Sequence, residues 1–327
     1  MATAQDTVAA EYDALTAGCG LVDRSERGKL ALTGGDAKEF LHGQVTNDVE
    51  GLEPGRGCYA AFLTHKGKML GDLRVLDTGD ELLLDTERVA LQELFTMIRR
   101  FKIGRDVELH KRTLERALLS LVGPRARAVA GADAAGLGEA EHDHVAAELA
   151  GVRRDQTHGD AGGVDVLCAS DRVAEVRAAL AGAGAVECGE QAAEIVRVER
   201  GRPRFGVDLE PEAVIPQEAG LNERAVSFTK GCYVGQETVA RLFYKGKPNR
   251  HLRGLRLSAP APTGSELHLG ERVVGRLGTC VESPELGPIA LAIVRREAAP
   301  GDTVAVGDEG VSAEVVELPF TEPPAAA

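Results

Sequence analysis

The chain has 327 residues, of which 43% are hydrophobic and 27% charged, and its formal net charge is −13. This length is sufficient for two or three domains, each with its own core. The acidic balance argues against a broad nucleic-acid-coating surface and leaves room for one local basic patch.

The six cysteines are dispersed, and no pair has the CxxC spacing of a zinc knuckle or a thioredoxin-like redox motif. Dispersed cysteines in a large chain are typical of a reducing cytosol. The N-terminus lacks the pattern of an export signal, and the chain has no apolar run of about 18 residues. We therefore predict a cytoplasmic protein with no membrane span and no metal site.

The first 105 residues predict a short helix, three strands and a longer helix. Asp36 and Glu39 have the spacing of a capping box, and Gly43 is a natural stop for a helix over 36–42. Strands are predicted around 58–63, 69–76 and 81–85, which gives an antiparallel meander. Apolar residues then recur at helical spacing from 88 to 101, with Gly104 after them.

A second α/β unit is predicted from about 106 to 230. Its strands lie near 107–109, 117–122 and 164–168, and its helices start at the Ser170-Asp171 cap and at Ala192. The intervening residues 130–162 are rich in Ala, Gly, Asp and Glu, which predicts a surface excursion. The His-Asp-His run at 142–144 lies there, and a solvated loop is favoured over a metal site.

Beyond residue 250, short apolar runs alternate with Gly and Pro turns. Several short strands at such spacing predict a small all-β barrel. The runs are 252–257, 272–277, 289–294, 303–306 and 312–318.

The octapeptide Lys230-Gly231-Cys232-Tyr233-Val234-Gly235-Gln236-Glu237 is the most informative motif. Its glycines predict a tight, approachable loop that leads into a helix. A nearby ammonium and a helix N-terminus both favour a thiolate over a thiol, so Cys232, with Lys230, is a candidate functional pair. The alternative is that Cys232 is a small buried hydrophobe.

The segment 241–256 carries six Lys or Arg residues and no acid. It could meet the carboxylates of an acidic ligand, an acidic partner protein or RNA. The alternative is an exposed interdomain linker with solvated charges.

Five further blocks, taken with the octapeptide, resemble the aminomethyltransferase superfamily, the folate-binding fold of the glycine-cleavage T protein. The octapeptide itself resembles the signature of the YgfZ-type branch, which assists iron–sulfur cluster assembly. The blocks are Leu30–Ala37, Phe40–Val49, Gly67–Leu73, Glu199–Gly206 and Gly287–Ala292.

The resemblance implies an α+β fold with two α/β units, about 1–105 and 106–245, around a central cleft. A C-terminal β-barrel over 246–320 completes it. Tetrahydrofolate or a one-carbon derivative is the implied ligand of the first 245 residues. Glu199 is the implied pterin anchor and Asp72 a second candidate, because a buried carboxylate can accept from pterin donors.

The remaining candidates for the folate site are Tyr59 and Tyr244, which could supply flat surfaces, and Arg241, which could meet the acidic tail. The resemblance implies an accessory protein for iron–sulfur enzymes, with cluster client or assembly proteins as partners. A single thiolate cannot hold a cluster alone, so any cluster would be shared.

The alternative is a tetrahydrofolate-dependent aminomethyltransferase or demethylase. The T protein carries adjacent aspartates in its meander, whereas this chain reads Gly71-Asp72 at that place. Because neighbouring strand residues face opposite sides, one remaining carboxylate puts aminomethyl transfer in doubt. An accessory that contacts RNA through 241–256 is the third hypothesis.

Overall fold

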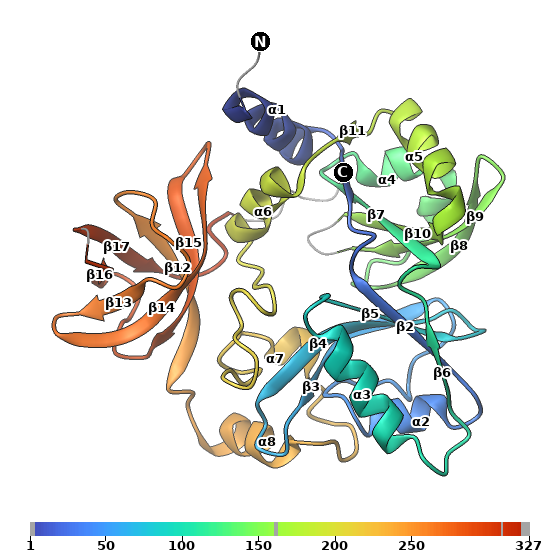
Figure 1. The fold of residues 1–327 in the computed structure, drawn as a ribbon, viewed down its shortest axis with the longest axis horizontal. Coiled ribbons are helices and arrows are strands. Elements are labelled where there is room, and N and C mark those ends of the chain that lie inside the picture. Colours follow the sequence, from blue (N-terminus) through green and yellow to red (C-terminus); the bar gives the residue numbers. More distant parts are fainter. Residues whose placement is uncertain (1–3, 160–162, 309, 322–327) are drawn as a thin grey trace.

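The computed structural model describes residues 4–159, 163–308 and 310–321. Two mixed α/β layers lie one above the other, and a closed β-barrel lies beside them (Figure 1). Helix α6 (Glu190–Glu199) runs between the barrel and the two layers. This is the predicted α+β architecture with a C-terminal barrel. Within the described residues, no helix is long and apolar enough to cross a membrane.

The lower layer is a five-stranded sheet with the order β3-β4-β5-β2-β6. All of its pairings are antiparallel, which confirms the predicted meander of β3, β4 and β5. Buried Leu94 and Ile98 pack the long helix of this layer against the core. Its elements are β2 (Gly28–Thr33), α2 (Ala37–His42), β3 (Arg56–Leu63), β4 (Met69–Asp77), β5 (Leu82–Thr86), α3 (Leu91–Phe101) and β6 (Glu108–Lys111).

The predicted capping box at the start of α2 does not form. Asp36 occupies the N-cap position without a side-chain cap bond, and its carboxylate instead accepts from the backbone N–H of Asp106 at 2.9 Å. Glu39 pairs with Arg105. The partners of Asp36 and Glu39 lie 70 and 66 positions away, which a local spacing rule could not anticipate.

The upper layer is a six-stranded sheet with the order β11-β1-β7-β10-β9-β8. Strand β1 of this sheet comes from the start of the chain, so the boundary between the two sheets does not fall at residue 105 of the sequence. Helix α1, which the sequence did not reveal, packs beside α6. The elements are α1 (Ala4–Ala17), β1 (Gly20–Asp23), β7 (Arg116–Val122), α4 (Ala126–Ala130), η1 (Ala132–Gly136), β8 (His144–Leu149), β9 (Val152–His158), β10 (Val164–Ala169), η3 (Ser170–Arg172), α5 (Val173–Gly182) and β11 (Val186–Glu187).

The prediction of a surface excursion over 130–162 is wrong for the described part of that range. Strands β8 and β9 form a hairpin that extends the upper sheet. His142 and His144 are 1% and 8% exposed, so they are not in a solvated loop. The sequence of these strands lacks an apolar alternation, because buried positions carry polar residues such as Gln156 and Thr157, whose types are typical of surfaces.

The barrel closes through six strands, one more than predicted, in the order β12-β15-β14-β13-β16-β17. The additional strand is only four residues long and carries Glu266 and His268, so it has little apolar signal. The strands are β12 (Arg250–Leu257), β13 (Glu266–Leu269), β14 (Arg272–Ser283), β15 (Gly287–Arg295), β16 (Thr303–Val306) and β17 (Val311–Val316).

Residues 201–249 connect α6 to the barrel; in Figure 1 they descend between the barrel and the lower layer, and α8 lies at the foot of the molecule. They contain α7 (Asn222–Ala225) and α8 (Gln236–Lys245). Ala225, Val226 and Val239 join the hydrophobic core of the lower sheet. The helix that was predicted to follow the octapeptide is therefore present and packed onto this layer.

Candidate functional site

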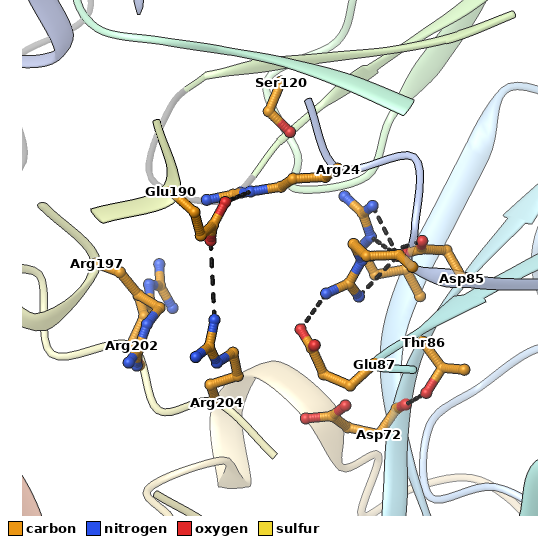
Figure 2. Close-up of polar contacts among 12 residues, drawn as sticks. Arg24, Asp72, Asp85, Thr86, Glu87, Ser120, Glu190, Arg197, Arg202 and Arg204 are labelled. Carbon is orange, nitrogen blue, oxygen red and sulfur yellow. Dashed lines mark hydrogen bonds and ion pairs between the residues drawn. The ribbon is translucent and has the colours of Figure 1, made fainter. Parts of the chain in front are cut away.

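A cleft opens between the two layers and α6, and a cavity of about 160 Å³ lies in it. Figure 2 shows Arg24, Glu190 and Arg204 on one side and Glu87 and Asp72 on the other. Eight of the lining residues are arginines and five are acidic, so the lining is net basic in an acidic protein. The arginines are Arg24, Arg27, Arg74, Arg197, Arg200, Arg202, Arg204 and Arg224.

Asp72 and Tyr59 lie together on the lower sheet and both line this cavity. The Tyr59 hydroxyl donates to Asp72 Oδ2 at 2.6 Å. The Arg224 guanidinium lies over the Tyr59 ring, 4.9 Å from its centroid. Asp72 is 5% exposed and its main-chain carbonyl accepts from Thr86. Two of the predicted ligand-binding residues are thus brought together, and Asp72 faces the cavity.

Gly71 occupies the other face of β4. A Cβ atom at this position would collide with the Phe62 ring and lie 2.8 Å from the Ala90 Cβ. A side chain at 71 would therefore point into the hydrophobic core of the lower layer, because strand residues alternate between faces. The cleft carboxylate of this strand is Asp72, whether or not a second acid precedes it.

A buried ion network joins the two layers beneath the cavity. Arg74 on β4 donates to Asp85 at 2.7 Å and also pairs with Asp165 on β10. Arg27 makes a second contact to Asp85 at 2.9 Å, and the Ser120 hydroxyl donates to Asp165 at 2.5 Å. Burial would raise the pKa of Asp85, but Arg27 and Arg74 outweigh it and hold that pKa below its usual value. The network fixes the separation of the two sheets.

On the α6 side, the cavity is lined by charges that are already paired. Glu190 accepts from Arg24 at 3.5 Å and lies 3.8 Å from Arg204. Arg197 pairs with Glu194 at 2.8 Å. None of these arginines is among the site residues predicted from the sequence. A signal existed for Arg74, which lies two residues after Asp72 on the same strand face, but none existed for Arg24.

A second cavity of about 700 Å³ adjoins the first. The two share Arg200, Arg202, Pro203 and Arg224 in their linings. The second also borders the start of β12 and the segment after β17. Ligand pockets in proteins usually measure about 300–1,000 Å³, so a ligand that began in the first cavity would extend into the second.

Glu199, the predicted pterin anchor, lies outside the linings of both cavities. Its carboxylate accepts from Tyr12 at 3.0 Å and from Ser283 at 2.6 Å. The side chain is 3% exposed, and burial raises its pKa. Its partners are 187 and 84 residues away, on α1 and β14, so Glu199 joins the N-terminal helix, α6 and the barrel.

Cys232 lies on an exposed loop between α7 and α8. All six cysteines are in the described part of the chain; Cys232 is exposed, and the other five are buried or half-buried. Gly235 has φ of 84° at the N-cap of α8, and a Cβ there would lie 2.6 Å from the Thr64 carbonyl oxygen. Glycine is therefore required at 235, whereas Gly231 is uncrowded.

The Lys230 ammonium is directed into the protein. It donates to the backbone carbonyls of His42, Val45 and Asn47, the last two at 2.7 and 2.9 Å. Burial lowers its pKa to about 8. The ammonium therefore anchors the cysteine loop to the segment that follows α2, which is a structural role.

The same segment contacts the cleft. Asn47 Nδ2 donates to the Tyr59 carbonyl at 2.8 Å and to the Arg224 carbonyl at 3.2 Å. The cysteine loop and the Asp72 cavity are thereby connected through Lys230, Asn47 and Tyr59.

The other octapeptide residues have structural or surface positions. Tyr233 is 8% exposed, and Lys230 Nζ lies 5.1 Å from its ring centroid. Gln236 begins α8 and its N–H donates to the Tyr233 carbonyl at 3.2 Å, while Glu237 is exposed in the first turn.

Arg241 and Tyr244, which were predicted to contact the folate, lie on α8 and line none of the cavities described above. Tyr244 is 66% exposed. The basic segment 241–256 is not a linker, because its second half forms strand β12. Arg250 and Arg253 there pair with Glu218 and Glu317 at 2.8 and 3.1 Å.

Residues 4–159, 163–308 and 310–321 contain no group of three His, Cys, Asp or Glu side chains arranged to hold a metal ion. His144 has a backbone carbonyl oxygen near each ring nitrogen, that of His142 3.3 Å from Nδ1 and that of Asp77 2.9 Å from Nε2. The His142 ring lies 6.3 Å from that of Tyr59. Both histidines are thus buried where the hairpin meets the lower layer, and neither lines the two cavities.

Comparisons with known proteins cover nearly the whole chain. Residues 2–230 match the family described as GCVT N-terminal domain, and residues 250–322 match the glycine cleavage T-protein C-terminal barrel domain. An aminomethyltransferase of Rubrobacter xylanophilus is 30% identical over 96% of this chain and 86% of its own. A chloroplastic protein of Arabidopsis thaliana, named as a transferase, is 29% identical over 96% of this chain and 74% of its own.

Among solved structures, the glycine cleavage system aminomethyltransferase T from Bartonella henselae has a similar fold. Its TM-score is 0.85 at 25% identity, over 97% of this chain and 90% of the other. The similarity includes the barrel, so the three-part arrangement is a property that the two proteins share.

Proposed function

Because the chain belongs to the glycine cleavage T-protein family, we propose that it binds tetrahydrofolate, or a one-carbon derivative, in the arginine-lined cleft. The single observation that carries the proposal is the pairing of Asp72 with Tyr59 in the cavity wall, opposite a row of arginines. A pterin presents ring N–H and amino donors, and a buried carboxylate is the acceptor they need. The tail of folate ends in carboxylates, which arginine binds in a bidentate manner.

The shape of the site supports one direction of binding. The smaller cavity, with Asp72 and Tyr59, is suited to the flat pterin, and Arg224 lies between it and the larger cavity. The acidic tail would then pass Arg200, Arg202 and Arg224 into the larger cavity, where Arg253 also lies.

Isothermal titration calorimetry with tetrahydrofolate, kept anaerobic, tests this proposal directly. We expect one site per chain and an affinity that falls as salt is raised, because charge-assisted contacts to the tail are screened. Absence of binding heat at every tetrahydrofolate concentration would count against the proposal.

For the biological role, we propose an accessory protein for iron–sulfur cluster enzymes that acts through Cys232. Two observations support this role: Cys232 is exposed, and its loop is connected to the folate cleft through Lys230 and Asn47. One thiolate supplies one of the four ligands that clusters usually take, so a cluster would be shared with a partner protein.

A deletion strain tests the accessory role. Several cluster-dependent activities should fall together in the strain and return with the wild-type chain but not with Cys232→Ser. The matched control is Cys280→Ser, because Cys280 lies half-buried on β14 of the barrel and outside the cysteine loop. Full complementation by Cys232→Ser would remove the loop cysteine from the proposal.

Aminomethyl transfer is a second candidate function, and the geometry of β4 is compatible with it. Gly71-Asp72 in place of an acidic pair argues against transfer from the sequence alone, but a side chain at 71 would face the core rather than the cleft. Asp72, the carboxylate of β4 that faces the cavity, is present. Tetrahydrofolate-dependent release of ammonia from an aminomethyl-lipoyl carrier protein would establish this activity, and its loss in Asp72→Asn would assign it to the cleft.

A further inference from the structure

Helix α8 and the loop before it expose a surface that we call the aromatic–basic patch. Only Val239 of α8 is buried, while Phe243 and Tyr244 are 48% and 66% exposed. Aromatic residues make up only 4% of the chain, so two exposed rings side by side are unusual for it. The patch consists of Val234, Arg241, Phe243, Tyr244, Lys245 and Lys247.

The cations of the patch lack partners. Within the part of the chain that the structure describes, Arg241, Lys245 and Lys247 form no ion pair, and all three are exposed. By contrast, Arg250 and Arg253, a few residues later, are both paired. In a chain of net charge −13, three unpaired cations around exposed rings form a local basic site that an acidic surface can recognise.

The patch is physically continuous with the cysteine loop. Phe228 stacks on Phe243 with ring centroids 3.7 Å apart, and Tyr244 meets Phe243 edge-on at 5.0 Å. This stack brings Phe228, before the cysteine loop, against Phe243 on α8. Exposed Cys232 and Val234 lie in the chain between these two rings.

We propose that the aromatic–basic patch is the docking surface for a protein partner with an acidic, partly apolar face, which brings that partner to Cys232. The inference rests on the proposed cluster function and adds where the partner binds. Aromatic and arginine side chains dominate the energetics of protein interfaces, and unpaired cations select an acidic partner.

A protein partner is favoured over RNA for two reasons. The molecule carries net charge −13, so a polyphosphate chain longer than the patch would be repelled by the surrounding surface. The Phe243 ring is already stacked on Phe228, which removes one of the two platforms a base could use.

Photocrosslinking in cells tests the proposal. The full chain carries p-benzoylphenylalanine in place of Tyr244, and a matched control carries it in place of Leu114, which is 88% exposed in the turn between β6 and β7. We expect the Tyr244 position, but not the Leu114 position, to crosslink one protein through a peptide rich in Asp or Glu. Lys245→Glu with Lys247→Glu should lower the crosslink yield about tenfold.

Rescue by charge exchange separates docking from chance capture. Replacing acids of the mapped peptide by Lys should restore the crosslink to the Lys245→Glu, Lys247→Glu chain. A crosslinked nucleotide, a second copy of this chain, equal yields at the two positions or no crosslink would each overturn the proposal.

The controls distinguish this failure from failure of the proposed function. The Lys245→Glu, Lys247→Glu chain should keep the wild-type melting temperature and folate affinity. If this double variant complements the deletion strain fully while Cys232→Ser does not, the docking proposal is wrong and the proposed role of Cys232 is kept. If Cys232→Ser also complements, the proposed accessory role of Cys232 is itself contradicted.

Discussion

A carboxylate that is 5% exposed, as Asp72 is, is stable in a folded protein only when its oxygens have donors. Tyr59 supplies one donor to Oδ2, and the side chain faces a cavity rather than the core. At the scale of single residues, the proposed pterin site therefore depends on Asp72, and Glu199 has a different task.

Replacing Asp72 by Asn should weaken tetrahydrofolate binding by about 1.5–3 kcal/mol, the range for hydrogen bonds to a charged group. Asn keeps the shape but presents donors toward the donors of the pterin. Calorimetry measures the change, with Asp80→Asn at the turn between β4 and β5 as the matched control. Equal affinities for the wild type and Asp72→Asn would exclude Asp72 from the site.

The cysteines should differ sharply in reactivity. Burial raises the thiol pKa of Cys19 and Cys188 to about 11 and that of Cys58 to about 12, so little thiolate forms there at neutral pH. We expect alkylation of the native protein at pH 7.5 to modify Cys232 first, with the other thiols reacting only after denaturation. Peptide mapping after a short pulse of iodoacetamide shows the order, and early labelling of Cys58 would contradict it.

At the scale of elements, one ion network holds β4 and β5 of the lower sheet to β7 and β10 of the upper. Breaking a buried ion pair on one side leaves a charge without its partner in a medium that solvates it poorly. Here Arg74 and Arg27 would each lose one of their two carboxylate partners and keep the other, Asp165 for Arg74 and Glu87 for Arg27.

Asp85→Asn should therefore lower the free energy of unfolding by about 3–5 kcal/mol. Because the folded pKa of Asp85 lies below the unfolded value of about 3.9, its contribution is present above that value and is lost as pH falls through the folded pKa. Urea unfolding at pH 7 should show the full difference between wild type and variant, and a series toward pH 3 should show it shrinking.

The control for this experiment is Glu175→Gln, which removes an exposed ion pair with Arg172. Exposed pairs contribute little, so its unfolding curve should stay close to that of the wild type. A difference for Asp85→Asn that stays constant down to pH 3 would mean that the carboxylate charge is not the cause.

At the scale of the whole molecule, α6 is the element that connects the three parts. Glu199 bonds α1 through Tyr12 and the barrel through Ser283, while Arg197 reaches Thr279 of the barrel at 2.7 Å. The same helix lines the cleft with Glu190 and Glu194. The placement of the barrel is thus coupled to the wall of the site.

Glu199→Gln should lower the free energy of unfolding by about 1.5–3 kcal/mol, because charge-assisted hydrogen bonds to α1 and β14 become weaker. Folate affinity, measured at a temperature where the variant is folded, should stay at the wild-type value. Thermal unfolding and calorimetry on the same samples give both numbers. Unchanged stability with weakened folate binding would return Glu199 to the ligand site.

Sequence periodicity was sufficient for the elements whose signal is local. The meander, the helix over 91–101 and most of the barrel strands follow from alternating or helical apolar spacing, and the structure contains them. The hairpin of β8 and β9 has no such signal, because its buried face carries polar side chains such as Arg154, Gln156 and Thr157.

The same division applies to the site. Local rules were enough to place Cys232 on an approachable loop, a helix after it and Asp72 on a strand of the meander, because glycine conformation and strand alternation are local properties. The packing of the layers was needed to show which face of that strand meets the cleft, that Lys230 donates to backbone carbonyls, and that Glu199 bonds Tyr12 and Ser283. The reason is physical: a hydrogen bond or a buried charge depends on the position of its partner, and these partners lie up to 187 residues away.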